Sequence, residues 1–415
     1  AFQYQLNGPL IVSHVTEAVQ QVMDRHEILR THFVLDEGGE VRQYVREAME
    51  VEEVVSLEEY KLESTQGQLA NWQHHHFDLV HGPLFRLLIL QEKEDQYIFS
   101  FVMHHIIGDM LSLNLFFQEV MLRYRALSQK EKLHLPPLDI HYKDYAKWIN
   151  DKLASSYFDE QKLFWQGYLR GLRRRPHWYG TKGHGGLEGH SLENSFAPEL
   201  AERIKDHCRH NKQGLMSVMA TALGVLIHKK TRQKDVLIGI PSSLRQHADL
   251  MGQMGLYLNV LPFRLTIDKD QDLNQLLYAA SQDQIQLLEA SFFPFDEIVE
   301  QFEKDHHFSL ASRMDVYLNV LVNDSSYLQE VEGLSVKALK VSEQKSKFPL
   351  CVYIRQLNGE LSYLIEYQTA IFAEKEMENF EQRLLKIIAQ MVDDPTGRIE
   401  GIQLVDEDAL PSFQL

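Results

Sequence analysis

Two histidines and an aspartate that directly follow an apolar run are the residues of this sequence best suited to chemistry. The run YIFSFVM at residues 97–103 is dominated by aromatic and β-branched types, which predicts a strand buried on both faces. His104 and His105 stand at its exit, and Asp109 follows four residues after His105, before a helix-like run at residues 111–124. An imidazole so placed could act in acid–base catalysis, while Asp109 could cap the helix or fix the loop.

Alternation of side chains along a strand separates the two histidines. If the strand geometry persists, His104 points away from the side that His105 faces, so a structural role is expected for His104. Position alone leaves two interpretations for His105: a catalytic group, or a core histidine that bonds a backbone carbonyl.

The segment HHIIGDM at residues 104–110 resembles the HHxxxDG signature of the condensation domains of nonribosomal peptide synthetases. These domains belong to the chloramphenicol acetyltransferase-like acyltransferase superfamily. Further segments resemble motifs of the family in the same order: DRHEILRTHF (residues 24–33), YKDYAKW (142–148), PSSLRQ (241–246), GLYLNVLP (255–262) and FPFDE (293–297). The resemblance therefore spans almost the whole chain.

The resemblance implies an α/β fold of the α+β sandwich type. Two chloramphenicol acetyltransferase-like subdomains would form a V-shaped pseudo-dimer, with the active site in the cleft between them. We expect an N-terminal subdomain at residues 1–172, a glycine-rich and basic linker at 173–190 and a C-terminal subdomain at 191–415. The length of 415 residues also favours two cores, since single cores stop growing near about 250 to 300 residues.

The same resemblance implies an amide-forming acyltransferase. The acyl or peptidyl group would be a thioester on the phosphopantetheine arm of one carrier protein, and the amine would be held on a second carrier. The implied partners are donor and acceptor carrier domains and neighbouring synthetase modules, with no cofactor bound by the chain itself. Three alternatives stay open: an ester-forming relative, a non-elongating domain that binds a carrier-tethered chain, and a CoA-dependent acyltransferase.

Residue roles follow from the match to the signature. His105 matches its second histidine and is expected to be catalytic, as a base or as the group that orients the amine. His104 and Asp109 are expected to be structural residues of the active site. In the family the aspartate pairs with a buried arginine, and Arg30 is the best candidate here, ahead of Arg25.

Met110 stands where the signature has glycine, so a bulky side chain replaces a position without a Cβ. Met110 either lines the substrate tunnel beside His105 or packs under the following helix. Asn259 could face the tunnel or cap a strand end. The remaining residues that flank motifs or could line the tunnel are Gly108, Ser243 and Arg245.

Composition excludes several classes of function. A net charge of −17 argues against a nucleic-acid partner, because such binding draws most of its affinity from Lys and Arg. No apolar run approaches the roughly 18 residues of a membrane span. Two cysteines, Cys208 and Cys351, form no CxxC pair and fit a reducing cytoplasm. The histidine runs at residues 74–76 and 306–307 lack partners at metal-site spacing, so no metal is expected.

Local patterns predict three further elements. Apolar residues at helical spacing near each end of the chain predict two helices that pack on sheets: Val15, Val19, Val22 and Met23, and then Phe380, Leu384, Ile387, Ile388 and Met391. The pair Asn358 and Gly359 between two β-rich runs predicts an antiparallel hairpin.

Overall fold

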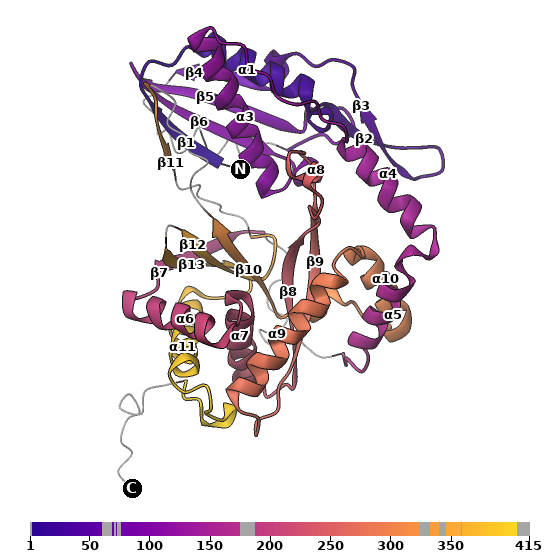
Figure 1. Cartoon of the computed structure of the whole chain (residues 1–415), viewed down its shortest axis with the longest axis vertical. Coiled ribbons are helices and arrows are strands. Elements are labelled where there is room, and N and C mark those ends of the chain that lie inside the picture. The colour runs from indigo at the N-terminus through magenta and orange to yellow at the C-terminus, as the bar shows by residue number, and fades with distance from the viewer. Residues whose placement is uncertain are drawn as a thin grey trace. The chain divides into compact units, whose positions relative to one another are not determined.

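The computed structural model describes residues 2–59, 69, 72, 76–174, 187–323, 333–339, 346–357 and 359–404. The chain forms two compact units, each a mixed α/β structure (Figure 1). The first comprises Ala1–Tyr157, Arg245–Leu258 and Ser325–Ser342, and the second comprises Phe158–Leu244, Asn259–Asp324 and Glu343–Leu415. Two segments from the second half of the sequence thus belong to the first unit, a feature that the expected division did not include. The expected linker lies within the second unit, and its residues 175–186 are outside the described part.

The first unit is built on a five-stranded sheet. The strand order is β11 (Ser335–Ala338), β1 (Phe2–Asn7), β6 (Gln96–Met103), β5 (Phe85–Lys93) and β4 (Val55–Glu59). Strand β6 pairs antiparallel with both β1 and β5, so the strand that ends at the signature is central. A separate two-stranded sheet consists of β2 (Thr31–Leu35) and β3 (Val41–Val45).

Helices α1 (Val12–Arg25) and α3 (Met110–Gln129) pack against each other over this sheet (Figure 1). The predicted apolar stripe of α1 is buried, with Val15, Val19, Val22 and Met23 at 1% exposure or less. Met254 and Leu334 lie in the same apolar core, although both come from the second half of the sequence. The unit also contains α4 (Tyr142–Leu153) and the short helix α8 (Ala248–Met251).

The second unit is built on a six-stranded sheet. Its strand order is β7 (Gly189–Ser195), β13 (Glu360–Gln368), β12 (Leu350–Leu357), β10 (Val316–Asn323), β8 (Asp235–Ser243) and β9 (Leu258–Thr266). Strand β10 runs parallel to β12 and β8, whereas β12 and β13 are antiparallel. The hairpin predicted at Gly359 is confirmed, and Gly359 has the positive φ of 84° that such turns favour; Asn358 is outside the described residues.

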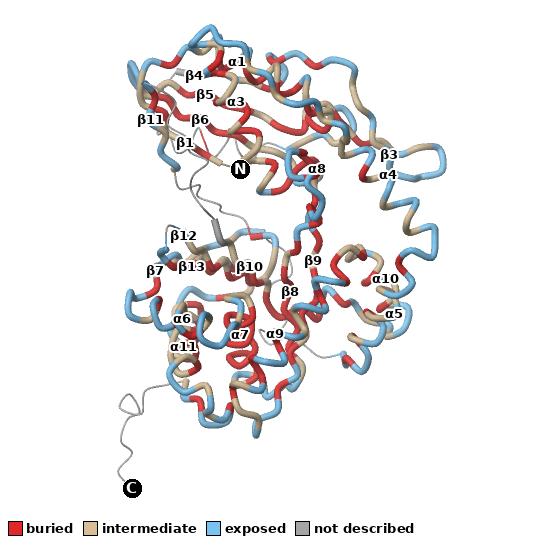
Figure 2. The backbone as a smooth tube through the Cα atoms, viewed as in Figure 1, coloured by how far each residue is buried: buried red, intermediate tan, exposed pale blue. Residues whose placement is uncertain are grey.

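Helices of the second unit gather on one face of this sheet (Figure 1). They include α6 (Pro198–Asn211), α7 (Leu215–Thr231), α9 (Leu273–Glu289) and α11 (Glu374–Asp393), with α5 (Asp159–Tyr168) and α10 (Phe295–His306) packed together beside them. Helix α7 is buried from Ser217 to His228, and Figure 2 shows it red among its neighbours. The predicted stripe of α11 is buried, as its sequence spacing indicated.

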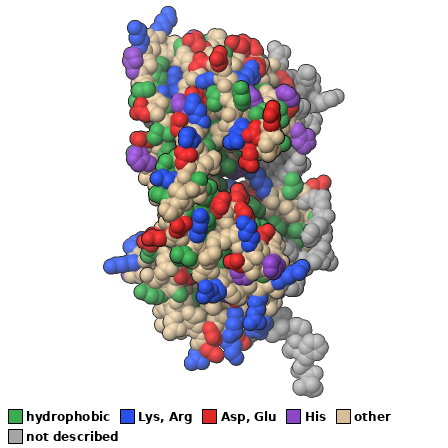
Figure 3. Space-filling view, turned by 90° about the vertical axis from the view of Figure 1, so that its right-hand side faces the viewer, with side chains coloured by type: hydrophobic (Ala, Val, Ile, Leu, Met, Phe, Trp, Pro, Cys, Tyr) green, Lys and Arg blue, Asp and Glu red, His purple; other side chains and the backbone are tan. Residues whose placement is uncertain are grey.

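Charged side chains of both signs are interspersed on the face that Figure 3 presents. Among the described residues no helix is both long and apolar enough to cross a membrane. Cys208 and Cys351 are both free, and Cys351 is buried.

Candidate active site

Strand β6 carries the signature to the surface of the first unit. Phe99 and Phe101 are fully buried within the sheet, which fixes the strand firmly. The backbone N–H of His104 still donates to Leu84 O at 2.8 Å, and the chain then turns into the 3-10 helix η3 (His105–Ile107). The predicted strand is therefore confirmed, and both histidines lie at its exit.

His104 folds back onto the backbone. Its Nδ1 accepts a hydrogen bond from the N–H of Ile106 at 3.2 Å, so the side chain caps η3. The edge of its ring meets Phe77, with centroids 6.0 Å apart. These contacts are those of a framework residue.

His105, in contrast, is exposed. It is the first residue of η3, and its carbonyl accepts from the N–H of Gly108. The core-histidine alternative considered for this position does not apply, because the side chain is outside the core of its unit. An exposed imidazole on a rigid strand exit can meet a substrate without rearrangement of the core.

Asp109 is buried at 8% exposure and pairs with Arg245, which is also buried. Arg245 Nη2 lies 3.0 Å from Asp109 Oδ1 and 3.2 Å from Oδ2, and Arg245 Nε lies 3.4 Å from Oδ2. Asp109 also caps α3, because its Oδ1 accepts from the N–H of Ser112 at 2.9 Å. Both roles suggested for Asp109, cap and ion-pair partner, are thus present.

The expected pairing of Asp109 with Arg30 is wrong. Arg30 donates instead to backbone carbonyls, from Nε to Met23 O at 3.0 Å and from Nη1 to Glu47 O at 3.0 Å. A side chain occupied in this way ties α1 to the β2–β3 region. Arg25, the second candidate, contacts Glu119.

Ser112 is a member of this buried hydrogen-bond network that the sequence interpretation missed. Its hydroxyl is fully buried, accepts from the N–H of Gly255 at 3.0 Å and accepts from Arg245 Nη2 at 3.1 Å. Its single proton can reach Asp109 Oδ1 at 2.8 Å or Gly255 O at 2.9 Å. The spacing D-x-x-S at a helix start is the local signal that could have pointed to it.

Tyrosines enclose the far side of this ion pair. The guanidinium of Arg245 lies 4.2 Å above the ring of Tyr257, whose backbone N–H donates to Asp109 Oδ2 at 3.2 Å. Burial raises the pKa of Tyr142 to about 12, so its neutral hydroxyl donates to Leu256 O at 3.2 Å. Together these contacts fix segment 245–258 to the signature within the first unit.

Two positions beside the histidines have opposite surroundings. A Cβ on Gly108 would clash with Met103 Sδ and lie 3.0 Å from Ser112 Cβ, so a larger residue here would require Met103 to shift. Met110, the first residue of α3, is 58% exposed. The alternative in which Met110 packs in the core is therefore wrong, and its side chain faces outward next to Asp109.

The two remaining candidates belong to the second unit. Asn259 is buried, and its amide donates to Ser291 O at 2.7 Å and Phe293 O at 2.8 Å while accepting from Phe295 N at 3.0 Å. These bonds join β9 to the start of α10 and give Asn259 a structural role within the second unit. Ser243 is exposed at the end of β8. Within the described ranges no cluster of ligating side chains could hold a metal.

Comparisons with known proteins identify the family of this chain. The family model for the condensation domain matches residues 2–410. Gramicidin S synthase 2 of Aneurinibacillus migulanus is 27% identical over 410 residues, and bacitracin synthase 1 of Bacillus licheniformis is 26% identical over 413. Both alignments cover 97% of this chain, but only 9% and 8% of the relatives, so the chain spans less than a tenth of their length.

Solved structures share the fold. The complex of the X-domain and OxyB from teicoplanin biosynthesis contains a chain with a TM-score of 0.86 at 20% identity, covering 97% of this chain and 90% of that one. The first condensation domain of the CDA synthetase gives a TM-score of 0.78 at 17% identity, covering 97% of this chain and 93% of that one. At these identities the likeness concerns the fold alone.

Proposed function

The chain belongs to the condensation-domain family, and on that basis we propose that it joins an acyl or peptidyl thioester to an amine to form an amide. Both reactants would be held on phosphopantetheine arms of carrier proteins, one a donor and one an acceptor. The far greater length of the curated relatives supports neighbouring synthetase modules that supply these carriers.

The reaction requires mainly that the protein hold the thioester and the amine close together. The amine nitrogen attacks the thioester carbonyl, the carbon–sulfur bond breaks, and the proton lost by nitrogen ends on the departing thiolate. An α-amine with a pKa of about 7.7 to 8.0 is partly neutral near pH 7. Holding the reactants together offsets roughly 7 to 11 kcal/mol of barrier, while general-base help gives about a hundred- to ten-thousandfold.

The observation that carries the proposal is the contrast between His105 and Asp109. His105 is exposed at the end of a rigid strand, where it can accept the proton of the amine or orient it. Asp109 is buried in an ion pair with Arg245 and serves the framework. The signature thus supplies both an accessible imidazole, that of His105, and the buried ion pair of Asp109 that stabilises the surrounding backbone.

The test uses two loaded carrier proteins and mass spectrometry of the acceptor carrier. His105→Ala is expected to lower the single-turnover rate by about a hundred- to ten-thousandfold while the circular dichroism spectrum stays unchanged. His81→Ala is the matched control, because His81 is an exposed histidine of the same unit outside the signature. Undiminished product from His105→Ala would remove the catalytic role.

The pH profile separates the two roles of His105. If His105 acts as a base, the limb of the rate profile that its deprotonation produces disappears in the alanine variant. If His105 orients the amine, the rate falls at every pH and the limb is retained.

A second candidate function rests on Met110. Its exposed side chain beside Asp109 stands where the family signature has glycine, so a substrate that approached this position would meet a methionine side chain. The corresponding function is a non-elongating domain that binds a carrier-tethered chain without condensation. Binding of a loaded donor carrier with no amide product from wild type, and product from Met110→Gly, would favour this candidate.

A further inference from the structure

A shallow cavity of about 470 Å³, wide open to solvent, lies in the first unit at some distance from the signature. It lies among the C-terminal end of α1, the second half of α3 and the loop that leads to α4. Its lining residues are Asp24, Arg25, Arg123, Leu133, His134, Leu135, Leu138 and His141. At about 1.5 Å per residue, Arg123 lies roughly 20 Å along α3 from Asp109, so this cavity is separate from the position of His105.

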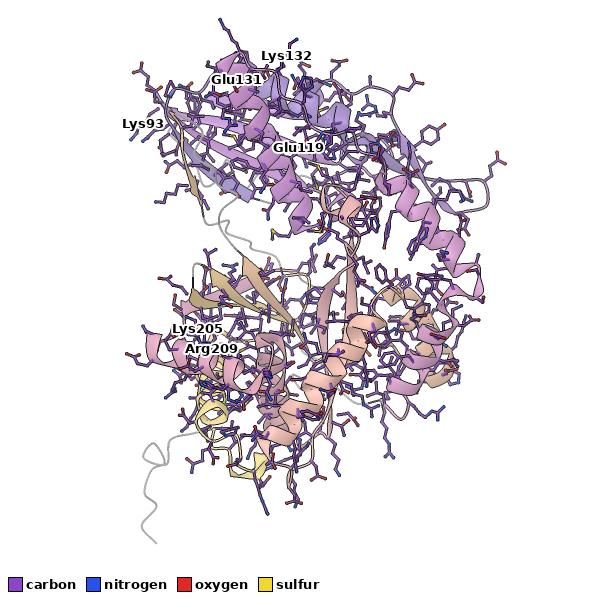
Figure 4. All side chains as sticks on the ribbon, in the orientation of Figure 1. Lys93, Glu119, Glu131, Lys132, Lys205 and Arg209 are labelled. Carbon is purple, nitrogen blue, oxygen red and sulfur yellow. The ribbon has the colours of Figure 1, made fainter. Side chains whose placement is uncertain are left out.

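Two arginines from different helices are held in place beneath the cavity by one carboxylate. Glu119, labelled on α3 in Figure 4, lies 3.4 Å from Arg25 Nε through Oε1 and 3.7 Å from Arg123 Nη2 through Oε2. His26 Nε2 adds a contact to Oε1 at 3.0 Å. The two guanidinium groups carry two positive charges and Glu119 one negative charge, so this largely buried cluster has a net positive charge.

Guanidinium donors remain available there. Arg123 Nη1 donates to Gln21 Oε1 at 3.0 Å, but the buried Arg123 Nε has no partner in the described part of the chain. Arg25 uses Nε toward Glu119, and its terminal nitrogens make no hydrogen bond with any described residue. A buried donor without an acceptor is costly, and an anionic oxygen is the acceptor that a guanidinium binds best.

The rest of the lining restricts the kind of anion. Leu133, Leu135 and Leu138, each partly buried, form the apolar part of a lining that is otherwise polar, and the volume falls in the range of small-molecule sites, about 300 to 1,000 Å³. An inorganic ion would leave these three leucines in contact with water. The exposed carboxylate of Asp24 disfavours a ligand with several negative charges.

His141 adds a polar group without adding charge. Burial lowers the pKa of His141, although nearby carboxylates oppose this shift, so the ring is neutral near pH 7 and can donate through its remaining N–H. His134 is exposed at the opening.

We propose that this cavity binds a small monocarboxylate with an apolar body. The carboxylate accepts hydrogen bonds from Arg25 and Arg123, and the apolar body lies against the leucines. The proposal does not depend on the condensation activity, since it concerns binding alone.

The test is isothermal titration calorimetry of the whole chain with hexanoate, compared with hexanamide and acetate. Hexanamide keeps the body and removes the charge, whereas acetate keeps the charge and removes the body. Hexanoate is expected to bind at least about tenfold more tightly than either compound. Equal binding of hexanoate and hexanamide, or no binding of hexanoate at millimolar concentrations, would overturn the proposal.

Variants locate the site. Arg123→Gln is expected to weaken hexanoate about tenfold or more, while Arg125→Gln, an exposed arginine of the same helix, leaves affinity unchanged. Asp24→Asn tests the site without disturbing the buried cluster, because Asp24 is exposed. This variant removes a negative charge beside the cavity and is expected to bind hexanoate more tightly. Unchanged affinity in Asp24→Asn together with unchanged affinity in a folded Arg123→Gln would place hexanoate elsewhere and refute the assignment.

Discussion

Removal of one partner of the Asp109–Arg245 pair is expected to destabilise the first unit strongly. In Asp109→Asn the guanidinium of Arg245, whose side chain is 1% exposed, would lose its counter-charge inside the protein. Breaking a buried pair in this way costs about 3 to 5 kcal/mol. With about 2 to 4 °C per kcal/mol, the melting temperature should fall by roughly 6 to 20 °C.

The two residues should also be coupled. Arg245→Gln loses the same ion pair and in addition leaves Leu250 O, now bonded by Nη1 at 2.7 Å, without its donor. Because the pair can be lost only once, the double variant should be more stable than the sum of the single losses predicts, by about 1 to 3 kcal/mol. Ser112, which bonds both residues, is retained in every variant.

Urea unfolding followed by circular dichroism measures this double-mutant cycle. Arg30 provides the matched control, since it is an arginine of the same unit that bonds backbone carbonyls and not Asp109. Asp109→Asn combined with Arg30→Gln should be additive within about 0.3 to 0.5 kcal/mol. The reasoning fails if Arg245 shows no coupling, or if Arg30 is coupled to Asp109 as strongly as Arg245 is.

Three other changes test particular contacts. Gly108→Ala should cost about 1 to 3 kcal/mol by overpacking against Met103, and Met103→Ala in the same chain should recover part of that loss; urea midpoints measure both. Met110→Ala should change stability by no more than about 0.5 kcal/mol, because the side chain is exposed, and a loss of several kcal/mol would contradict that placement. Burial pushes the pKa of Glu119 upward, but a hydrogen bond from a histidine and cationic neighbours hold it below its ordinary value. A depressed carboxyl pKa stabilises the folded state above the unfolded pKa of about 4.3, so the advantage of wild type over Glu119→Gln should be full at neutral pH and disappear in urea titrations as pH falls below that value.

Patterns confined to a few residues predicted their structures correctly. The strand before the signature, the apolar stripes of α1 and α11 and the hairpin of β12 and β13 each depend on side-chain alternation, helical spacing or turn chemistry. The α/β class followed from the family resemblance, and it agrees with the two mixed units. Sequence spacing could not predict that segments 245–258 and 325–342 join the first unit, because that depends on the path of the whole chain.

The partner of Asp109 could not be found for the same reason. Both Arg30 and Arg245 lie in segments that resemble family motifs, and the motif letters do not state which guanidinium reaches the aspartate. In the structure the donors of Arg30 are occupied by carbonyls close to it in sequence, while Arg245 comes from 136 positions away. Ser112 could have been predicted more easily. Asp109 is the N-cap of α3 and Ser112 is the third residue of that helix, which is the spacing at which an N-cap side chain accepts a hydrogen bond from the backbone.

Neighbouring residues of the signature differ in burial and in the contacts they make, and this difference affects how their variants should be interpreted. Asp109 and Met110 are adjacent, yet one is 8% and the other 58% exposed. Asp109 holds Arg245 and, through Tyr257 N, segment 245–258, so loss of activity at Asp109 would report a displaced segment as readily as lost chemistry. His105 is exposed, in contrast to Asp109. A folded His105→Ala protein is therefore a more direct test of the catalytic role proposed for His105 than any variant of Asp109 is.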